Sequence, residues 1–309
     1  MALLLTPPVL GGQEEGRDAI LALMPDLDVR LWPDVGDAGD IEYVLVGRFD
    51  IAELPPLPNL RVLMAMFAGF EYFLGHPECP PAPCVRTGPP AGDTSMTEYA
   101  VLHVLRHHRA MPTYLAQKTQ KLWQTIPHKQ PHEQRIGFLG FGNMAQAPAK
   151  ALAGLDFDVA AWVRRPRSDG DVTIFAGDAG FLPFLARTDI LVCLLPLTDQ
   201  TRDILNAGTF AGLPDGAAVI NLGRGDHLVV DDLIAALDSG HLSGATLDAT
   251  SPEPLPPESP LWSHPAITIM PHVARRVRPS TGAPQVIENI HRDRAGEPLL
   301  WQVDREAGY

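Results

Sequence analysis

Short apolar runs recur along the first third of the chain, at residues 3–5, 29–32, 43–46, 62–67 and 84–87. Runs of this length, separated by polar and proline-rich stretches, are typical of buried strands. Between the first two, residues 17–24 place apolar side chains at helical spacing. The alternation predicts a sheet covered by helices, that is, an α/β fold.

The alternation continues from residue 135 to 272. Each of three apolar segments there is followed by a side chain that can bind an anion or carry a proton: residues 217–222 by Arg224, residues 245–247 by Asp248 and then Glu253, and residues 267–270 by His272. In an open parallel sheet the carboxyl ends of neighbouring strands meet at one edge, where ligands bind. The pattern therefore predicts an arginine, a carboxylate and an imidazole in one crevice, which suits reduction of a 2-oxo acid.

Two helices connect these regions. A long helix is predicted from Thr94 onward, with Asp93 or Thr94 as its N-cap, because apolar and small side chains share one face at Met96, Tyr99, Ala100, His103 and Val104. Residues 124–133 are polar, contain two prolines and predict a loop. A second helix is predicted around residues 283–295.

Residues 135–145 predict an apolar strand that turns through Gly140 and Gly142 into a helix beginning near Met144. Gly140 permits the tight turn, Gly142 lets a diphosphate approach the backbone, and Ala145 is small enough for the helix to pack on a sheet. The diphosphate would lie at the N–H groups of the helix N-terminus. A tight turn without a ligand would also explain the glycines, but the surrounding alternation favours a dinucleotide site.

The next strand, residues 156–163, is followed by Arg164, Arg165 and Arg167. A protein that prefers NAD usually has an Asp or Glu here, which holds the ribose 2'-hydroxyl. Guanidinium groups instead bind a 2'-phosphate by charge-assisted hydrogen bonds. The segment predicts NADPH as the preferred cofactor, with NADH usable; the alternative is a solvated basic loop.

The 309 residues suffice for two domains with hydrophobic cores. With 24 basic and 37 acidic residues the formal charge is −13, which disfavours nucleic acid and anionic lipid as partners. An anionic substrate must therefore meet a local cationic pocket, for which Arg224, Arg275 and Arg276 are candidates. No apolar run reaches the roughly 18 residues of a membrane span, and the first residues lack the basic start of a signal peptide, so a cytoplasmic location is expected.

The three cysteines, Cys79, Cys84 and Cys193, lack the paired spacing of zinc ligands. Cys193 lies within the apolar run 190–195 and is expected to be a buried thiol. A reducing cytosol argues against the disulfide that Cys79 and Cys84 could form.

Several short motifs follow one another in a fixed order: Gly140-Phe-Gly142-Asn-Met-Ala145, Leu195-Pro-Leu-Thr198, Asn221-Leu-Gly-Arg224-Gly225, Gly244-Ala-Thr-Leu-Asp248, Glu253-Pro254, Pro271-His272-Val-Ala274 and the closing residues 302–309. In this order they resemble the D-2-hydroxyacid dehydrogenases over nearly the whole chain, and within that family the glyoxylate/hydroxypyruvate reductases of the A group. The resemblance implies a Rossmann-type doubly wound parallel sheet at residues 99–277, which binds the cofactor. It also implies a smaller, discontinuous, flavodoxin-like α/β substrate domain at residues 1–98 and 278–309.

The resemblance assigns catalytic roles to three residues. It implies that Arg224 binds the substrate carboxylate and polarises the carbonyl, that His272 is the general acid, and that Glu253 hydrogen-bonds His272. A neighbouring carboxylate does favour the protonated imidazolium. Each residue alone would also fit a structural position, but the three together favour a site. Cofactor contacts are implied for Gly140, Gly142, Asn143, Met144, Arg164, Arg165, Leu195, Pro196, Thr201, Leu222, Gly223, Asp248 and His272.

Residues 60–67 predict a strand that ends in small residues, Ala68 and Gly69, whose N–H groups suit a substrate carboxylate. The family usually has Gly-Ala-Gly here, and Phe67 replaces the first glycine, which favours a small oxo acid. Arg275 and Arg276 either extend the substrate range toward doubly anionic acids or form ion pairs, and the second is favoured.

The resemblance further implies a homodimer built on the cofactor domain and residues 94–121. The apolar side chains of Tyr114, Leu115, Leu122 and Trp123 fit such an interface, and fit an additional core face equally well.

These observations predict NADPH-dependent reduction of a small 2-oxo acid, glyoxylate- or hydroxypyruvate-like, to the (R)-2-hydroxy acid. One alternative is a dehydrogenase of the same scaffold that acts on phosphite, formate or a bulkier 2-oxo acid. Another is a dinucleotide-sensing binding protein without turnover, against which the filled arginine, glutamate and histidine positions argue.

Overall fold

The computed structural model describes residues 1–7, 12–47, 49–67, 69–88, 94–168, 170, 172–275, 277–306 and 308. The chain divides into two compact units: unit 1 is Met1–Asp93 with Arg276–Tyr309, and unit 2 is Thr94–Arg275. The divisions fall at residues 94 and 276 rather than at the expected 99 and 278. The first lies earlier because the helix that starts at Ser95 belongs as a whole to unit 2.

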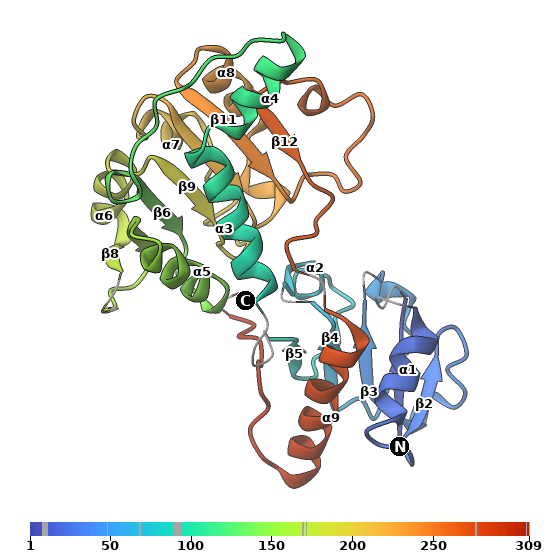
Figure 1. Cartoon of the computed structure of the whole chain (residues 1–309). Coiled ribbons are helices and arrows are strands. Elements are labelled where there is room, and N and C mark those ends of the chain that lie inside the picture. The colour runs from blue at the N-terminus through green and yellow to red at the C-terminus, as the bar shows by residue number, and fades with distance from the viewer. Residues whose placement is uncertain are drawn as a thin grey trace. The chain divides into compact units, whose positions relative to one another are not determined.

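Unit 1 has a parallel sheet with the strand order β2-β1-β3-β4-β5 over its described residues (Figure 1). Its strands are Ala2–Leu5 (β1), Asp28–Leu31 (β2), Ile41–Val46 (β3), Val62–Ala65 (β4) and Cys84–Arg86 (β5). Its helices are Gln13–Leu21 (α1), Glu71–Leu74 (α2) and Pro279–Ala295 (α9), with 3-10 turns at Ala38–Asp40 and Ile51–Glu53. This strand order is the flavodoxin-like one, as expected.

Both faces of the unit 1 sheet are buried, because alternate side chains of a strand point to opposite faces. Leu3 and Leu5 of β1 share one core with residues of α1 and α9. Leu4 belongs to the core on the other face, with Phe70 and Phe73 from the start of α2. A strand buried on both faces, such as β1, is therefore apolar at every position, which is why short continuous apolar runs predicted the strands of this sheet.

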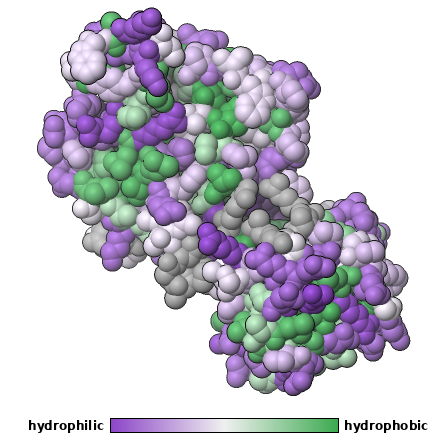
Figure 2. Space-filling view, turned by 45° about the vertical axis from the view of Figure 1, so that its right-hand side comes forward, coloured by the Kyte–Doolittle hydropathy of each residue, from purple (hydrophilic) through white to green (hydrophobic). Residues whose placement is uncertain are grey.

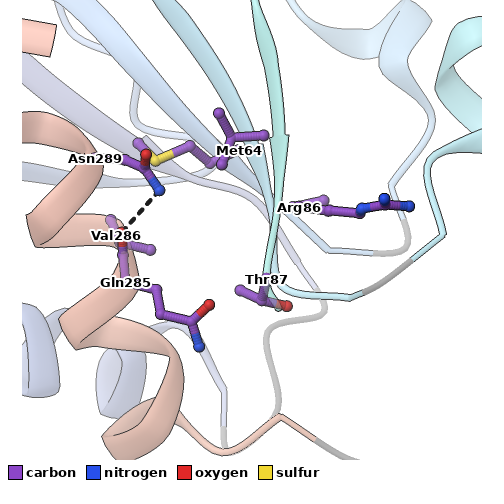
Figure 3. A pocket seen from close by; sticks show the side chains of 8 residues that line it. Met64, Arg86, Thr87, Gln285, Val286 and Asn289 are labelled. Carbon is purple, nitrogen blue, oxygen red and sulfur yellow. Dashed lines mark hydrogen bonds between the residues drawn. The ribbon is translucent and has the colours of Figure 1, made fainter. Parts of the chain in front are cut away.

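A cavity of about 10 Å³ lies between α9 and strands β4 and β5 (Figure 3). Its lining includes Met64, Thr87, Gln285 and Asn289, and the amide of Gln285 hydrogen-bonds both the N–H and the carbonyl of Gly88. A space of this size holds about one water molecule. It is too small for a substrate and is part of the packing.

Unit 2 has a parallel sheet with the strand order β12-β11-β10-β9-β6-β7-β8 over its described residues (Figure 1). Its strands are Arg135–Leu139 (β6), Asp158–Val163 (β7), Thr173–Ala176 (β8), Ile190–Cys193 (β9), Ala217–Asn221 (β10), Leu242–Leu247 (β11) and Ile267–Ile269 (β12). Its helices are Ser95–His108 (α3), Met111–Thr119 (α4), Asn143–Gly154 (α5), Gly177–Ala186 (α6), Ala207–Ala211 (α7) and Val230–Asp238 (α8), with 3-10 turns at Pro131–Glu133, Gly225–His227 and Pro260–Trp262. This is the doubly wound Rossmann order with one further strand, and it reverses between β6 and β9.

Alternation also buries both faces of the unit 2 sheet. Val219 of β10 contributes to the core that α6, α7 and α8 complete, and Ile220 to the core with α3 and α5. Cys193 is fully buried, as expected, and burial raises the pKa of its thiol to about 12. No helix of the described part of the chain is long and apolar enough to cross a membrane.

The long helix predicted from Thr94 is α3, with Thr94 at the N-cap position. It ends at His108, and Ala110 takes a left-handed backbone with φ of 50° before α4 begins. An alanine carries no sequence signal for this conformation, which L-residues other than Gly and Asn rarely adopt. Strand β8 was also not predicted.

A buried carboxylate ties the amino ends of the unit 2 strands together. Oδ2 of Asp189 accepts hydrogen bonds from Lys129 Nζ at 2.8 Å and from the Arg135 backbone N–H at 3.0 Å, and Oδ1 accepts from Arg135 Nη2 at 2.6 Å. Burial alone would raise the pKa of Asp189, but these donors outweigh it and hold the pKa below its ordinary value.

We expect Asp189→Asn to lower the free energy of unfolding by about 2 to 4 kcal/mol near neutral pH, since two cations lose their partner in a half-buried setting. Because the pKa of Asp189 is lower in the folded protein, the stabilisation is fully present above the unfolded-state pKa of about 4. It is lost as the pH falls through the folded-state pKa. Urea unfolding of both proteins between pH 3 and 7 should therefore show a difference that shrinks at the acidic end. The exposed loop variant Glu258→Gln is the control, and a pH-independent difference would contradict the assignment.

Candidate active site

Three neighbouring strands of unit 2 end at the same edge of the sheet. Asn221 of β10, Leu247 of β11 and Ile269 of β12 are paired in register. Backbone hydrogen bonds continue past the strand ends, from Asp248 N to Asn221 O at 3.0 Å and from His272 N to Asp248 O at 2.8 Å. The segments that carry Arg224, Glu253 and His272 therefore leave the sheet side by side, as predicted.

The turn that carries Arg224 is packed against the segment leading to Glu253. A Cβ atom added to Gly225 would lie 2.0 Å from the carbonyl carbon of Thr250, so the turn has no room for a side chain there. Ser251 Oγ also donates to Asp226 Oδ1 at 2.6 Å. The guanidinium of Arg224 is half-buried, and its Nη1 donates to Gly223 O at 3.0 Å.

His227, which was not among the predicted site residues, holds this turn in place. Buried His227 accepts the Arg224 backbone N–H at Nδ1, at 3.0 Å. Its Nε2 lies 3.3 Å from the carbonyl oxygen of Pro196. The ring thus joins the Arg224 turn to the segment that follows β9.

His272 and Glu253 form the pair that the sequence predicted. Nδ1 of His272 lies 3.0 and 2.9 Å from the two carboxylate oxygens of Glu253, and the side chains are 29% and 17% exposed. The backbone N–H of Thr250 donates to Glu253 Oε1 at 3.2 Å, which orients the carboxylate. His272 has a left-handed backbone, with φ of 51°. Strained conformations of this kind cluster at functional sites.

Asp248 holds the backbone around His272. Its carboxylate, 2% exposed, accepts the N–H groups of Val273 at 2.9 Å and Ala274 at 3.0 Å. The hydroxyl of Tyr99, on α3, donates to Asp248 Oδ1 at 2.8 Å. Burial, together with this hydrogen bond, raises the pKa of Tyr99, which keeps the hydroxyl a donor. The sequence indicated Tyr99 only as a helix residue, and its spacing holds no signal for this long-range contact.

The glycine turn after β6 has the predicted geometry. Gly140 has φ of 92°, and a Cβ there would lie 3.0 Å from Leu195 Cδ2 and 3.2 Å from the Leu194 carbonyl carbon. Gly142 is the N-cap of α5, and a Cβ there would meet nothing within 4 Å. A side chain would thus fill an open space beside the N-terminus of a helix, where N–H groups and the helix dipole attract an anion.

The helix begins at Asn143, next to Met144 and the buried Ala145. The open space at Gly142 and the helix N-terminus at Asn143 can therefore accept the diphosphate of a dinucleotide.

Of the three arginines predicted to bind the cofactor phosphate after β7, Arg167 contacts this turn. Arg167 Nη1 donates to Phe141 O at 3.0 Å, and its guanidinium lies 5.3 Å from the Phe141 ring centre. Arg164 and Arg165 are exposed, and Arg164 Nη1 lies 3.4 Å from Gln200 Oε1. Arg167 therefore anchors the segment to the glycine turn, while Arg164 and Arg165 present their cations to solvent.

The remaining predicted cofactor contacts follow β9 and β10 at the same edge. Thr201 Oγ1 donates to Pro196 O at 2.7 Å, and Gly223 N donates to Asn221 Oδ1 at 3.1 Å. Leu195 lies against Gly140, and Leu222 is 5% exposed. These residues and the glycine turn flank the point at which the strand order reverses, where doubly wound sheets bind their ligands.

Not every predicted residue is placed at this edge. Ala68 and Arg276 lie outside the described residues, and Arg275 is half-buried. Gly69 belongs to unit 1, and its role in substrate binding stays a prediction. The Phe67 ring stacks on Phe73 at 5.9 Å between ring centres, so it takes part in packing. Within the described part of the chain no cluster of His, Cys, Asp or Glu could hold a metal ion.

Residues 101–274 match the family model of the D-isomer specific 2-hydroxyacid dehydrogenase NAD-binding domain. A D-isomer specific 2-hydroxyacid dehydrogenase from Xanthobacter autotrophicus Py2, crystallised with NADPH and MES, is 37% identical, with a TM-score of 0.93 over 100% of this chain and 99% of that one. The NADPH-dependent glyoxylate/hydroxypyruvate reductase from Sinorhizobium meliloti, crystallised with NADP and sulfate, is 32% identical, with a TM-score of 0.92 over 100% of both chains. A probable 2-hydroxyacid dehydrogenase from Rhizobium etli CFN 42, with NADP, HEPES and L(+)-tartaric acid, is 28% identical, with a TM-score of 0.88 over 100% of this chain and 99% of that one.

The Rossmann strand order agrees with these matches, and the three solved structures extend over the whole chain. The protein is an oxidoreductase with an NAD(P)-binding domain, and it belongs to the D-isomer specific 2-hydroxyacid dehydrogenase family.

Proposed function

We propose that the protein reduces a small 2-oxo acid, glyoxylate- or hydroxypyruvate-like, to the (R)-2-hydroxy acid with NADPH. The observation that carries the proposal is the His272–Glu253 pair, at 2.9 Å, in which Glu253 belongs to a loop packed against the Arg224 turn. The arrangement combines an anion-binding guanidinium with an oriented imidazole. The substrate class follows the 32% identical reductase from Sinorhizobium meliloti, which is a glyoxylate/hydroxypyruvate reductase.

In this proposal Arg224 binds the substrate carboxylate with its planar fork of N–H donors and polarises the carbonyl oxygen. When bound, the nicotinamide supplies the hydride. Glu253 engages Nδ1 of His272, so the proton leaves from Nε2 and goes to the substrate oxygen as negative charge develops there. Asp248, through the N–H groups of Val273 and Ala274, fixes the backbone on which the imidazole stands.

For the cofactor, we propose that Gly140, Gly142, Asn143 and Met144 hold the diphosphate and that Arg164 and Arg165 bind the 2'-phosphate. Asp248 is assigned to the nicotinamide end, and Leu195, Pro196, Thr201, Leu222 and Gly223 are assigned as further cofactor contacts. Three similar proteins were crystallised with NADPH or NADP, which supports this choice. A cytoplasmic location is part of the proposal, and it agrees with three cysteines that are all free.

We also propose that the chain forms a homodimer through α4 and the segment after it. After α4 the chain runs without helix or strand toward β6, and Trp123 on this segment is 100% exposed (Figure 1). Leu115 and Leu122 are 48% and 47% exposed, so they do not form the additional core face that was the alternative. Tyr114, in contrast, makes a hydrogen bond within the chain, because its hydroxyl accepts the Ile126 N–H at 3.0 Å.

Hydrophobic areas alternate with hydrophilic ones over the visible surface (Figure 2). A fully exposed tryptophan next to exposed leucines is nevertheless unusual for a monomer, and a second copy of the chain would cover these side chains.

The reaction is tested with glyoxylate and hydroxypyruvate by following NADPH oxidation. We expect His272→Gln to lower kcat by about 100-fold or more, since a general acid contributes this much, and Arg224→Ala to raise KM steeply as well as lower kcat. His241→Gln is the matched control, because His241 also pairs with a carboxylate, Asp215 at 2.8 Å, but just before β11 at the opposite end of the strand. Near-normal rates in both site variants would refute the mechanism, and binding of NADPH without turnover of any 2-oxo acid would favour the sensing protein.

Cofactor choice is tested by the ratio of kcat/KM for NADPH to that for NADH. The double variant Arg164→Ala, Arg165→Ala should lower this ratio by at least about tenfold, because each charge-assisted contact to a phosphate contributes on the order of 1 kcal/mol. Lys150→Ala removes an exposed cation of α5 and should leave the ratio unchanged. An equal ratio in wild type and the double variant would show that the segment is only a solvated loop.

The dimer is tested by sedimentation velocity over a range of protein concentrations. Trp123→Ser with Leu122→Ser should weaken dimerisation by at least about 100-fold, since buried aromatic residues dominate interface energies. Tyr72→Ser removes a 72% exposed aromatic residue of unit 1 and should have no effect. A wild-type chain that sediments as a monomer at high concentration would rule out the interface.

A further inference from the structure

Two cysteines and an arginine form a cluster in unit 1 that the proposed reaction does not use. Cys79 follows α2, Cys84 is the first residue of β5, and Arg305 lies in the C-terminal segment. Nη2 of Arg305 lies 3.9 Å from Cys79 Sγ and 3.0 Å from Cys84 Sγ. The same nitrogen donates to the carbonyl oxygens of Pro80 and, at 2.7 Å, of Ala82. One guanidinium thus bridges both sulfur atoms and the chain between them.

Backbone hydrogen bonds hold the three side chains in place. Cys84 pairs with Leu63 of β4, and its carbonyl accepts Val303 N–H at 2.8 Å. Cys79 N–H donates to His76 O at 3.0 Å. The sulfur atoms therefore meet because of the sheet and the docked C-terminal segment.

The two thiols differ in environment. Cys84 is 1% exposed, whereas Cys79 is half-buried and reachable from solvent. The hydrogen bond from Cys84, supported by the charge of Arg305 and a smaller effect of His76, outweighs burial and lowers the pKa of Cys79 to about 6. The hydrogen bond to Cys79, followed by burial, raises the pKa of Cys84. Near neutral pH this gives a thiolate beside a thiol, and the thiolate is the reactive form of cysteine.

We propose that Cys79 and Cys84 are a hydroperoxide-reactive pair, in which Cys79 is the attacking sulfur, Cys84 the resolving one and Arg305 the cation that positions both. The Cys79 thiolate attacks the O–O bond of hydrogen peroxide. An S–O bond forms, the O–O bond breaks, and the leaving hydroxide takes up a proton as water. Cys84 then gives up its proton and attacks Cys79 Sγ, so that the S–S bond forms and the S–O bond breaks with release of a second water. Two thiols are oxidised to one disulfide, and one hydrogen peroxide is reduced to two waters.

The third cysteine is a built-in control. Cys193 is fully buried in unit 2, and burial raises the pKa of its thiol. A buried neutral thiol is inert. Oxidation should therefore distinguish Cys79 and Cys84 from Cys193 within one molecule.

The proposal is tested on the full, reduced chain by adding hydrogen peroxide, alkylating the remaining thiols and digesting with trypsin. Both cysteines fall in the tryptic peptide 62–86, so the disulfide appears as this peptide without alkylation and lighter by two hydrogens. We expect Cys79 and Cys84 to lose alkylation at least about tenfold faster than Cys193. Equal rates at all three cysteines, or two alkylated thiols that persist in excess peroxide, would overturn the proposal.

Variants separate the roles within the pair. Cys84→Ser, or Cys84→Ala if the serine variant does not fold, should stop at a Cys79 sulfenic acid that dimedone traps. Cys79→Ser should slow oxidation of residue 84 by at least about tenfold. A Cys79→Ser variant in which Cys84 is still oxidised at the wild-type rate would contradict the assignment of the attacking sulfur.

The effect of Arg305 on the Cys79 thiol is tested by measuring how the rate of Cys79 alkylation depends on pH. The groups that face Cys79 are Cys84, Arg305 and His76. The alkylation rate of the wild type should be half-maximal at pH about 6. Arg305→Gln should move this midpoint upward and slow the peroxide reaction, while Arg17→Gln, which removes a partly exposed arginine of α1 that pairs with Asp18, should do neither. A midpoint near the ordinary thiol value of about 8.5 in the wild type would overturn the assigned thiolate.

Discussion

Four segments of unit 2 meet at Asp248. The backbone of Asp248 is bonded to Asn221, the last residue of β10, and to His272 after β12, and its side chain accepts from Tyr99 of α3 and from the two residues after His272. A buried carboxylate is costly unless such donors surround it. Because one donor lies on α3 and the other two follow His272, satisfying this one group fixes the position of the His272 segment against α3.

Much of the fold follows from local pattern. Parallel strands buried on both faces are apolar throughout, which made the segments that became β3, β6, β9 and β10 recognisable in the sequence. Gly140 indicated the strand–helix turn because its backbone, with φ of 92°, favours glycine, and Gly142 because it leaves an open space beside the helix N-terminus. The Glu253–His272 pair followed from strand ends in a parallel sheet, together with a family resemblance.

Other features depend on contacts between distant residues and left no local signal. Tyr99 and His227 support the site through partners far away in the chain, Asp248 and Pro196. The break at Ala110 does have a local mark, Pro112 in the first turn of α4, but the left-handed backbone of the alanine itself has none. Cys79 and Cys84 were recognised as a possible pair, but the arginine that bridges them comes from the opposite end of the sequence.

The discontinuity of unit 1 has a consequence for biosynthesis. Its core includes Val277, two residues before α9, and Ala283, Val286, Ile287 and Ile290 of α9. On the ribosome these side chains emerge after residues 94–275, which already contain the complete core of unit 2. Domains fold as units during synthesis, so the nascent chain can fold the dinucleotide-binding unit first, while the N-terminal strands stay without their full core until α9 has been synthesised.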